Sequence, residues 1–435
     1  MDMAVIMLGM LLMLILVLKR VHVCIAALGA TVFIALCSGM DVKEVVEDGF
    51  LAGVGEFLSS VWLMILLGGI LSRLMDVSGA ARSLAGAVTE MMGKEGAIPS
   101  IILAGALLTY GGVSSMVTSY ALYPIALAVF RKADLPERLI PAAVGAGIFT
   151  WVTMLPGNPS VQNIIPTEYL GTTPMAAPAV GIGAAFITFA LQVVYFRYEV
   201  EKTKKKGAHF VEDERVRAVL ADADKLEQEG RLPGLFCSVL PIVSISVTLN
   251  IFKMDISVAL MIGILFCLIL FRKNFKGKYM DDCLSEAVNL SASAAIGVSS
   301  VVGLGNAVKL TPGFDVIVSR LIGFIGGGGN TLAVFAIATT LLCGLNASGM
   351  GGLSTVMSAV GDTFLGLGIN PDILHRIVVI ASAGLDSLPH SGGIVTLLTI
   401  SGISYKDGYG PLFISTVVTA LIALAAAVLM GNVLY

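Results

Sequence analysis

Charged residues are scarce in this chain. They make up 13% of its 435 residues, against about 25% in ordinary soluble proteins. Apolar residues make up 56%, and the mean hydropathy is +0.91. Such a chain has too little polar side-chain material to cover a water-facing exterior. The composition excludes a soluble enzyme, a nucleic-acid-binding protein and a disordered protein, and it predicts an all-α polytopic membrane protein surrounded by a lipid bilayer.

Motifs for cofactor, metal and catalytic chemistry are also missing. The six cysteines are scattered without a CxxC pair, which indicates neither a metal site nor a disulfide framework. There is no GxxxxGK[ST] motif for ATP-driven transport, and there is no GxSxG or HExxH motif. We therefore expect no cofactor, no metal and no catalytic residue. Two alternatives stay open against this pattern: a channel, and an intramembrane hydrolase built from Asp386, His390 and Ser391.

Apolar runs of about 20 residues predict membrane-spanning helices. Eight runs are uninterrupted, at residues 3–18, 21–38, 57–74, 178–196, 233–252, 256–271, 284–305 and 410–430. Three longer stretches contain helix breakers, at residues 98–130, 138–176 and 331–403. Each interrupted stretch predicts either a re-entrant hairpin or a broken helix.

Lysine and arginine favour the cytoplasmic side of a membrane. Placing Lys19 and Arg20 inside puts the N-terminus and an acidic 39–56 loop outside. The 197–232 segment, with nine basic residues, is then a solvated and partly helical cytoplasmic linker, and the C-terminus lies outside. This assignment holds only if 98–130 and 331–366 are re-entrant hairpins that enter from opposite sides.

The two halves of the chain match in element order at an offset near 233 residues. Leu155-Pro156-Gly157-Asn158 aligns with Leu388-Pro389-His390-Ser391. Each half contains five crossings and one hairpin, and this odd number predicts inverted repeats, as in many secondary transporters. The predicted first repeat is 1–196, with scaffold helices in 3–75, hairpin 98–130, broken helix 138–176 and helix 178–196. The second is 233–435, with scaffold helices in 233–305, hairpin 331–366, broken helix 374–403 and helix 410–430.

Helix breakers and small polar residues coincide at four places within the apolar stretches, 109–115, 155–160, 344–352 and 388–393. In lipid, non-helical backbone is tolerated only inside protein or beside a water-filled cavity. The helix that restarts after each break presents free N–H groups, which attract a carboxylate. The predicted substrate-binding residues are Gly111, Gly112, Ser114, Ser115, Asn158, Ser160, Asn346, Ser348, His390, Ser391, Gly392, Gly393 and Thr396; Asn163 is a further hydrogen-bonding candidate.

Charge near the breaks is confined to a few residues. Lysine and arginine are absent from 95–130, 139–196, 333–375 and 377–405, which favours a substrate with one carboxylate. Asp386, expected in the half-helix before the last break, and His390 within that break are the candidate coupling-ion residues. Packing or kink-stabilising roles for both residues remain alternatives. Six charges nearer the span ends are interpreted as interfacial or gating groups: Glu56, Arg73, Asp76, Arg82, Lys309 and Asp362.

The segment Leu-Asp-Ser-Leu-Pro-His-Ser-Gly-Gly over 385–393, followed by Gly-Ile-Ser-Tyr-Lys-Asp over 402–407, resembles the gluconate permease (GntP) family of the ion transporter superfamily. The Ser-Gly-Gly-Ile that follows His390 is similar to permeases of short hydroxy acids such as 3-hydroxybutyrate. The resemblance implies a bacterial inner-membrane symporter, usually proton-driven, that forms a dimer and works by an elevator mechanism. It places binding residues at hairpin tips and helix breaks, here Ser114, Ser115, Asn158, Ser160, Asn346, Ser348, His390 and Ser391.

The sequence thus predicts a secondary transporter that imports a small organic anion (a monocarboxylate, a hydroxycarboxylate or a sugar acid) together with a proton. Sodium coupling, as in transporters of citrate or dicarboxylates, is the main alternative. The partners expected are the anion, H⁺ or Na⁺, lipid and a second copy of the chain, with no nucleic acid.

Overall fold

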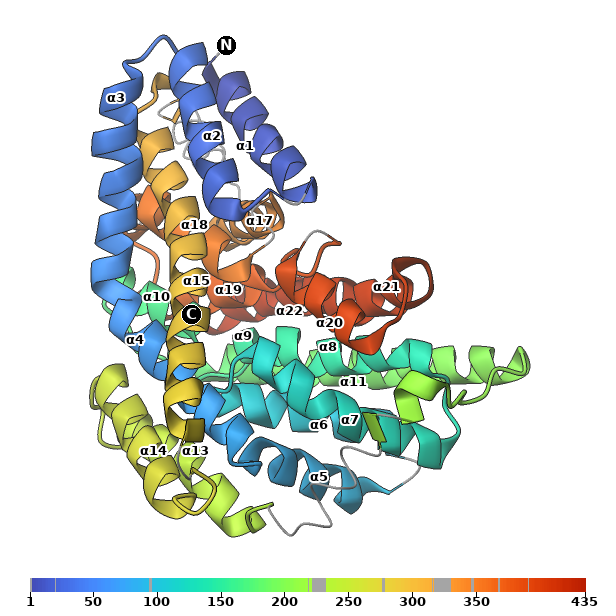
Figure 1. Cartoon of the computed structure of the whole chain (residues 1–435). Helices are drawn as coiled ribbons and strands as arrows, with labels where there is room; N and C mark the ends of the chain where they lie inside the picture. The colour runs from blue at the N-terminus through green and yellow to red at the C-terminus, as the bar shows by residue number, and fades with distance from the viewer. Residues whose placement is uncertain are drawn as a thin grey trace.

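The computed structural model describes residues 2–19, 21–93, 96–217, 219–220, 232–275, 278–314, 316, 330–345, 348–366, 368–389 and 391–435. Across these residues the chain forms helices and turns, with no strand (Figure 1). The predicted all-α class is therefore confirmed for the described part of the chain. The predicted residues Asn346 and His390 lie outside it.

The first half is a succession of apolar helices divided by short turns. Its elements are α1 (Asp2–Leu18), α2 (Val23–Cys37), α3 (Val42–Glu44), the π-helical turn η1 (Val45–Leu51), α4 (Ala52–Val77), α5 (Ala80–Met92), α6 (Ala97–Tyr110), α7 (Ser115–Ala133), the 3-10 turn η2 (Glu137–Leu139), α8 (Ile140–Gly145), the π-helical turn η3 (Ala146–Thr150), α9 (Trp151–Met154), α10 (Val161–Leu170) and α11 (Pro178–Lys205). Pro and Gly stand at the break between α9 and α10, because proline cannot donate the hydrogen bond that a continuing helix needs.

The second half presents a similar order of helices. Its elements are α13 (Leu235–Asn250), α14 (Ile256–Leu270), α15 (Lys278–Lys309), α17 (Thr331–Leu345), α18 (Gly349–Leu365), α19 (Pro371–Ser382), α20 (Gly392–Ser401), α21 (Tyr405–Phe413), the π-helical turn η4 (Ile414–Val418) and α22 (Thr419–Leu434). Most of these helices coincide with the apolar runs predicted from the sequence.

Three helices in the described residues are long and apolar enough to cross a membrane: Pro178–Lys205, Met280–Lys309 and Tyr405–Leu434. A bent pair, Val42–Ser59 with Trp62–Val77, raises the number to four if it counts as one broken span. Several predicted spans are shorter apolar helices, such as Val23–Cys37 and Ile256–Leu270. A helix of 15 residues is about 22 Å long, less than the roughly 30 Å of a bilayer core.

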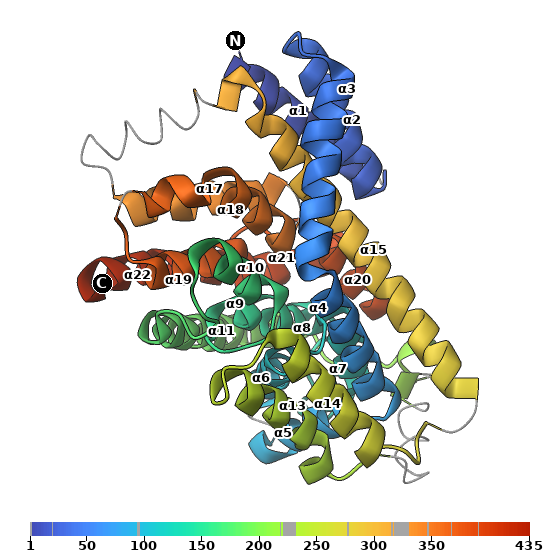
Figure 2. The ribbon, with the colours of Figure 1, turned by 90° about the vertical axis from the view of Figure 1, so that its left-hand side faces the viewer.

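The helices α4 and α15 pack along each other and form the long axis of the molecule (Figures 1 and 2). α1 and α2 lie at one end of this pair and α13 with α14 at the other (Figure 1). A small apolar core joins α1 and α2 to η1 and α15, through residues such as Ile34 and Phe50. The main core runs through the remaining helices and includes Leu71 of α4, Phe130 of α7 and Phe335 of α17.

The expected acidic loop at 39–56 is wrong, because most of this segment is helical. Asp41 caps the start of α3, since its carboxylate accepts hydrogen bonds from the N–H groups of Lys43 (2.8 Å) and Glu44 (3.0 Å). The helix then continues through η1 into α4. Acidic residues near a helix N-terminus favour the helix, so the acidic residues of 41–48 start a helix here.

The described part of the 197–232 linker packs against the helices, whereas the sequence predicts a solvated connector. α11 continues to Lys205, well beyond the predicted end of the span at residue 196. Further along, the side chains of Val216 and Leu220 are buried. Arg215 donates hydrogen bonds to the hydroxyl of Tyr123 in α7 and to the carbonyl of Ser401 at the end of α20. The segment thus contacts the middle of α7 and the end of α20, two helices that come from different halves of the chain.

Candidate functional site

The first break joins α6 to α7. α6 ends at Tyr110, and Gly112 in the following turn has a φ of +87°, a conformation that glycine adopts without strain. Ser114 is the N-cap of α7, and its Oγ accepts a hydrogen bond from the backbone N–H of Val117 (3.4 Å). The break therefore lies where the sequence predicts it, and it leaves the N-terminus of a 19-residue helix at the turn.

Ser72 of α4 holds this turn in place. Its Oγ accepts a hydrogen bond from the backbone N–H of Ser114 (3.0 Å) and donates to the Oγ of Ser114 (3.3 Å). The neighbouring Ser115 instead donates to the carbonyl oxygen of Ile148 in η3 (3.2 Å). The two predicted serines therefore attach the turn to two different elements. Gly111 packs against α13, since a Cβ added there would lie 2.6 Å from Ile242.

The second break, between α9 and α10, is organised by the fully buried Asn158. Its amide nitrogen donates to the carbonyl oxygens of Val152 (3.1 Å) and Leu155 (2.5 Å), and its Oδ1 accepts from the N–H of Ser160 (3.0 Å). Asn158 thus satisfies the backbone groups that the break leaves without helical partners. Ser160 caps α10 by accepting from the N–H of Asn163 (3.3 Å).

The two breaks meet at one cavity of about 440 Å³ between the α6–α10 region and the α4–α15 pair. Gly112 lies against the ring of Pro159, because a Cβ added to Gly112 would be 3.3 Å from Pro159 Cγ. Of the predicted residues, the cavity lining contains Gly112, Ser114, Ser115 and Ser160. Its other polar lining residues are Ser72, Arg73, Thr109, Gln162, Ser291 and Ser293.

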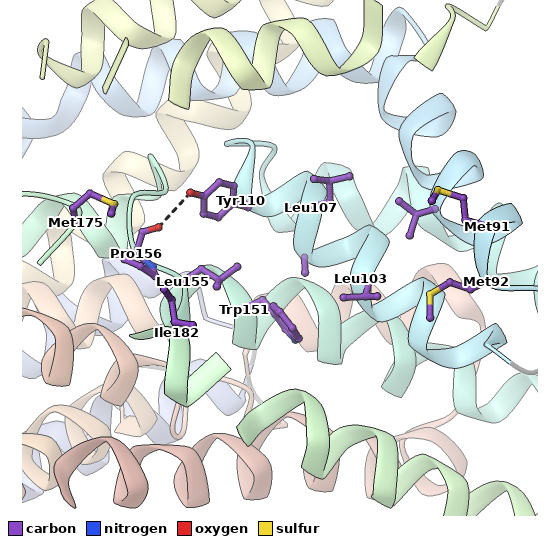
Figure 3. A pocket seen from close by; sticks show the side chains of 12 residues that line it. Met91, Met92, Leu103, Leu107, Tyr110, Trp151, Leu155, Pro156, Met175 and Ile182 are labelled. Carbon is purple, nitrogen blue, oxygen red and sulfur yellow. Dashed lines mark hydrogen bonds between the residues drawn. The ribbon is translucent and has the colours of Figure 1, made fainter. Parts of the chain in front are cut away.

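A second hollow, lined in part by α5 and α6, is almost entirely apolar. Its volume is about 690 Å³, and its lining includes Met91, Met92, Leu103, Trp151 and Ile182 (Figure 3). Tyr110 stands at its edge, and its hydroxyl donates a hydrogen bond to the carbonyl of Pro156 (3.3 Å; Figure 3). This hollow offers few hydrogen-bond donors to a carboxylate, so the 440 Å³ cavity is the candidate site for an anion.

The third and fourth breaks pack against each other in the second half. Ser348 directly precedes α18, and its Oγ accepts a hydrogen bond from the N–H of Gly351 (3.1 Å). A Cβ added to Gly344 would lie 2.8 Å from Leu385 Cβ, and one added to Gly349 would lie 3.2 Å from the Asp386 carboxylate. The two segments are therefore in close contact, as the first two breaks are.

Asp386 lies within the fourth break. The prediction that it belongs to the half-helix before this break is wrong. α19 ends at Ser382 and α20 begins at Gly392, so the break is longer than predicted. The start of the break packs closely against α17, because a Cβ added to Gly384 would lie 2.8 Å from Thr340. The Asp386 carboxylate accepts a hydrogen bond from the hydroxyl of Ser387 (2.8 Å).

The second-half candidates lie outside the lining of the 440 Å³ cavity. They are Ser348, Asp386, Ser391, Gly392, Gly393 and Thr396. Ser391 is buried, and Gly393 packs against Phe149, to which an added Cβ would be 2.9 Å away. Among the described residues of α17 and α18, Met350 lines the cavity.

A buried cation, Arg376, links the two halves of the chain. The sequence analysis did not include it among the site residues. Arg376 of α19 is fully buried, and it donates to the carbonyls of Ala176 (2.9 Å) and Pro174 (2.8 Å) and to the side-chain oxygen of Asn163 (3.0 Å). The neighbouring His375 lies 2.6 Å from the hydroxyl of Thr172 and 3.3 Å from the same Asn163 oxygen. These bonds hold α10, and with it Ser160, in place.

The cavity is also lined by Arg73, a residue that the sequence indicates as an interfacial or gating group. Arg73 of α4 lines it, and its guanidinium pairs with Asp76 (2.6 Å) and with Glu286 of α15 (2.5 Å). The position of Arg73 near the end of an apolar run gave no sign of this contact. In the described part of the chain, no group of three or more His, Cys, Asp or Glu side chains is arranged to hold a metal ion.

Comparison with known proteins gives consistent matches to permeases. Residues 1–262 match the model of the GntP family permeases. The "Uncharacterized transporter YxjC" of Bacillus subtilis is 30% identical over 408 residues, covering 85% of this chain and 86% of the relative. The "Inner membrane permease YgbN" of Escherichia coli is 35% identical over 101 residues, or 23% and 22% of the two chains. The "Gluconate permease" of Pseudomonas aeruginosa is 30% identical over 142 residues, or 32% and 31%.

Proposed function

Because the chain belongs to the GntP permease family, and is therefore a membrane permease and not an enzyme, we propose that it is a secondary active transporter that imports a small organic anion by cation symport. The proposed substrate is a monocarboxylate, a hydroxycarboxylate or a sugar acid. The printed name of the Pseudomonas relative supports a sugar acid, whereas the 385–393 segment favours a short hydroxy acid such as 3-hydroxybutyrate.

One observation carries this proposal: two helix N-termini and a set of hydroxyl groups share one cavity. Ser114 and Ser160 cap α7 and α10, and both line the cavity. A helix N-terminus carries about half a positive charge and unpaired N–H donors, which bind carboxylates. The volume of about 440 Å³ is within the range of about 300–1,000 Å³ typical of small-molecule sites.

The contacts between helices support two inverted repeats. The pair α1–α2 corresponds by order to α13–α14, and α4 to α15. α14 packs against α4 while α2 packs against α15, and α10 packs against α18 while α20 packs against α7. Such reciprocal contacts are those expected of a pseudo-two-fold axis between the repeats. The repeats would be 1–196 and 233–435, joined by the 197–232 linker.

We propose an elevator mechanism that uses the same division. In this proposal α1, α2, α4, α13, α14 and α15 form the fixed scaffold, and the hairpins and broken helices form the mobile body. The cavity supports it, because one wall comes from α4 and α15 and the other from the turns before α7 and α10. The remaining proposals, taken from the sequence, are a homodimer in the bacterial inner membrane with both termini outside and the linker in the cytoplasm.

Asp386 is the proposed proton carrier. It is the single acidic residue between residues 374 and 405, and it lies beside Gly349 at the hairpin tip. Binding of a proton there would neutralise a carboxylate in the mobile body before that body crosses the membrane, where a charge is costly. His390 is proposed as its partner from the sequence. The alternative is sodium, held by the carbonyl groups of the unwound segments.

The test is uptake of radiolabelled gluconate, 3-hydroxybutyrate and lactate into proteoliposomes under an imposed pH gradient, with and without sodium. We expect one of these anions to accumulate against its gradient when only the pH gradient is present. Accumulation that needs sodium would establish the alternative coupling, and equilibration without accumulation would indicate a channel.

A matched pair of variants tests the cavity. Ser114→Ala with Ser160→Ala removes two cap hydroxyls that line the cavity, and we expect at least a ten-fold loss in apparent affinity. Ser404→Ala removes the cap of α21, whose Oγ accepts from the N–H of Asp407 (3.3 Å) and which lies outside the cavity lining. Equal uptake by both variants would show that the cap hydroxyls of the cavity do not bind the substrate.

A further inference from the structure

Among the described residues that line the 440 Å³ cavity, Arg73 is the one with an ionised side chain. Building on the proposed transport of an organic anion, we propose that Arg73 binds the carboxylate of the substrate and that Glu286 occupies the same edge of the guanidinium while the cavity is empty. Glu286 thus acts as a built-in competitor for the substrate.

The guanidinium of Arg73 makes two ion pairs in this structure. Its Nη1 lies 2.6 Å from Oδ2 of Asp76, three residues further along α4, and its Nη2 lies 2.5 Å from Oε2 of Glu286 on α15. The Nε is buried and has no hydrogen-bond partner. Guanidinium groups bind carboxylates in a two-point geometry, so a substrate carboxylate can bind this edge only if one of the two acids leaves.

Glu286 is the acid that leaves. Its side chain is 52% exposed, against 17% for Asp76. An exposed carboxylate gives up an ion pair at little net cost, because water replaces the lost partner and the side chain regains its freedom. Asp76 is on the same helix as Arg73 and also interacts electrostatically with Arg82, which holds it in place.

The α15 wall beside Arg73 contributes two serine side chains to the cavity lining. Ser291 is 4% exposed, lines the cavity, and its Oγ has no hydrogen-bond partner. It fits against Gly69 of α4, where an added Cβ would lie 2.0 Å from that Oγ. Ser293 follows Glu286 by seven residues, which places both on one face of α15 two turns apart, and it also lines the cavity.

This arrangement favours one chemical class of substrate. A single carboxylate replaces that of Glu286 on Arg73, and the hydroxyl groups of the anion bind to Ser291 and Ser293. A second carboxylate would find no second cation among the described residues that line the cavity, and burying an unpaired charge is costly. The site therefore selects hydroxylated monocarboxylates over dicarboxylates. Arg73, Ser291 and Ser293 belong to the proposed scaffold, so they bind the anion as it enters the cavity. The helix ends at Ser114 and Ser160, which line the same cavity, then carry the anion with the mobile body.

The test compares substitutions that should act in opposite directions. Equilibrium binding of radiolabelled gluconate, 3-hydroxybutyrate and lactate is measured on the purified full-length chain in nanodiscs, with malate as the dicarboxylate. For the anion that the wild type binds, Arg73→Gln should weaken binding at least ten-fold, and Glu286→Gln should tighten it at least three-fold. Arg138→Gln and Glu47→Gln remove matched ion pairs outside the cavity and should leave affinity within two-fold.

The outcomes separate this inference from the proposed function. If the wild type binds an anion and Arg73→Gln does not weaken that binding, the proposed role of Arg73 is wrong. If Glu286→Gln weakens the binding or leaves it unchanged, the proposed role of Glu286 is wrong. In both cases the proposal that the chain is a transporter stands. Binding of none of the three anions by the wild type overturns both. If Arg73→Gln does not fold, anion binding is measured on Arg73→Lys instead. The tightening of binding expected for Glu286→Gln then tests the same proposal.

Discussion

Substitution of Arg376 by methionine should weaken both the fold and the candidate site. Methionine keeps most of the apolar stem that packs beside Gly181, but it removes the donors to Ala176, Pro174 and Asn163. Each buried acceptor left without a donor costs about 1–3 kcal/mol. Some of this cost is regained because a charge no longer has to be buried.

The expected net loss is about 3–5 kcal/mol of unfolding free energy. In a chain of this length, that loss corresponds to a fall in melting temperature on the order of 5 °C. Because Asn163 follows the cap residue Ser160 in α10, we also expect weaker substrate binding below the melting temperature. Purified protein in detergent would be melted with a thiol-reactive dye or by intrinsic fluorescence, and anion binding would be measured in parallel.

The exposed Arg131→Met, at the end of α7, is the matched control and should melt like the wild type. A double-mutant cycle with Asn163→Ala sharpens the test. Arg376 and Asn163 share one hydrogen bond, so their effects should depart from additivity by about 0.5–3 kcal/mol. An unchanged melting temperature in Arg376→Met, or strict additivity in the cycle, would refute the idea that this buried cation fastens α10.

Three further outcomes are expected. Gly112→Ala, at φ +87° and with its added Cβ 3.3 Å from Pro159, should destabilise the chain by about 1–2 kcal/mol, seen as a lower melting temperature. Asp386→Asn should retain anion binding but lose pH-driven accumulation; retained accumulation would return this residue to a structural role. Hydrogen bonds from His209 and from the Phe210 N–H lower the pKa of Asp134. The contribution of this carboxylate to docking the linker is therefore present above about pH 4 and lost below it. Hydrogen exchange of the Phe210 amide should show protection at pH 6 that fades under acid and is reduced at all pH values by Asp134→Asn.

The positions of the helix breaks were predictable because they depend on local chemistry. Glycine with positive φ and proline without an N–H act within one or two residues, so the breaks at 109–115 and 155–160 could be read from the chain. The fourth break is longer than predicted, since α19 ends at Ser382, and the contact of Gly384 with Thr340 of α17 is one that the local sequence does not indicate. The 39–56 segment was wrongly expected to be a loop because its acidic residues suggested solvent, whereas Asp41 caps a helix.

The hydrogen-bond and ion-pair partners of polar side chains often come from residues far away in the sequence. Asn158 was a predicted substrate ligand, yet its amide is occupied by the backbone of its own break. Arg73 and Glu286 are separated by 213 residues, and Arg376 reaches a turn about 200 residues earlier. Nothing in the local sequence indicates such pairs.

The amino-acid sequence by itself determined that this chain is an all-helical membrane permease with broken helices, because hydropathy and helix breakers act locally. Only the tertiary structure decided which breaks share a cavity, which charge lines it and which groups are already satisfied. The reason is physical: burial and hydrogen bonding are properties of the packed helices, and packing brings together residues that the chain keeps apart.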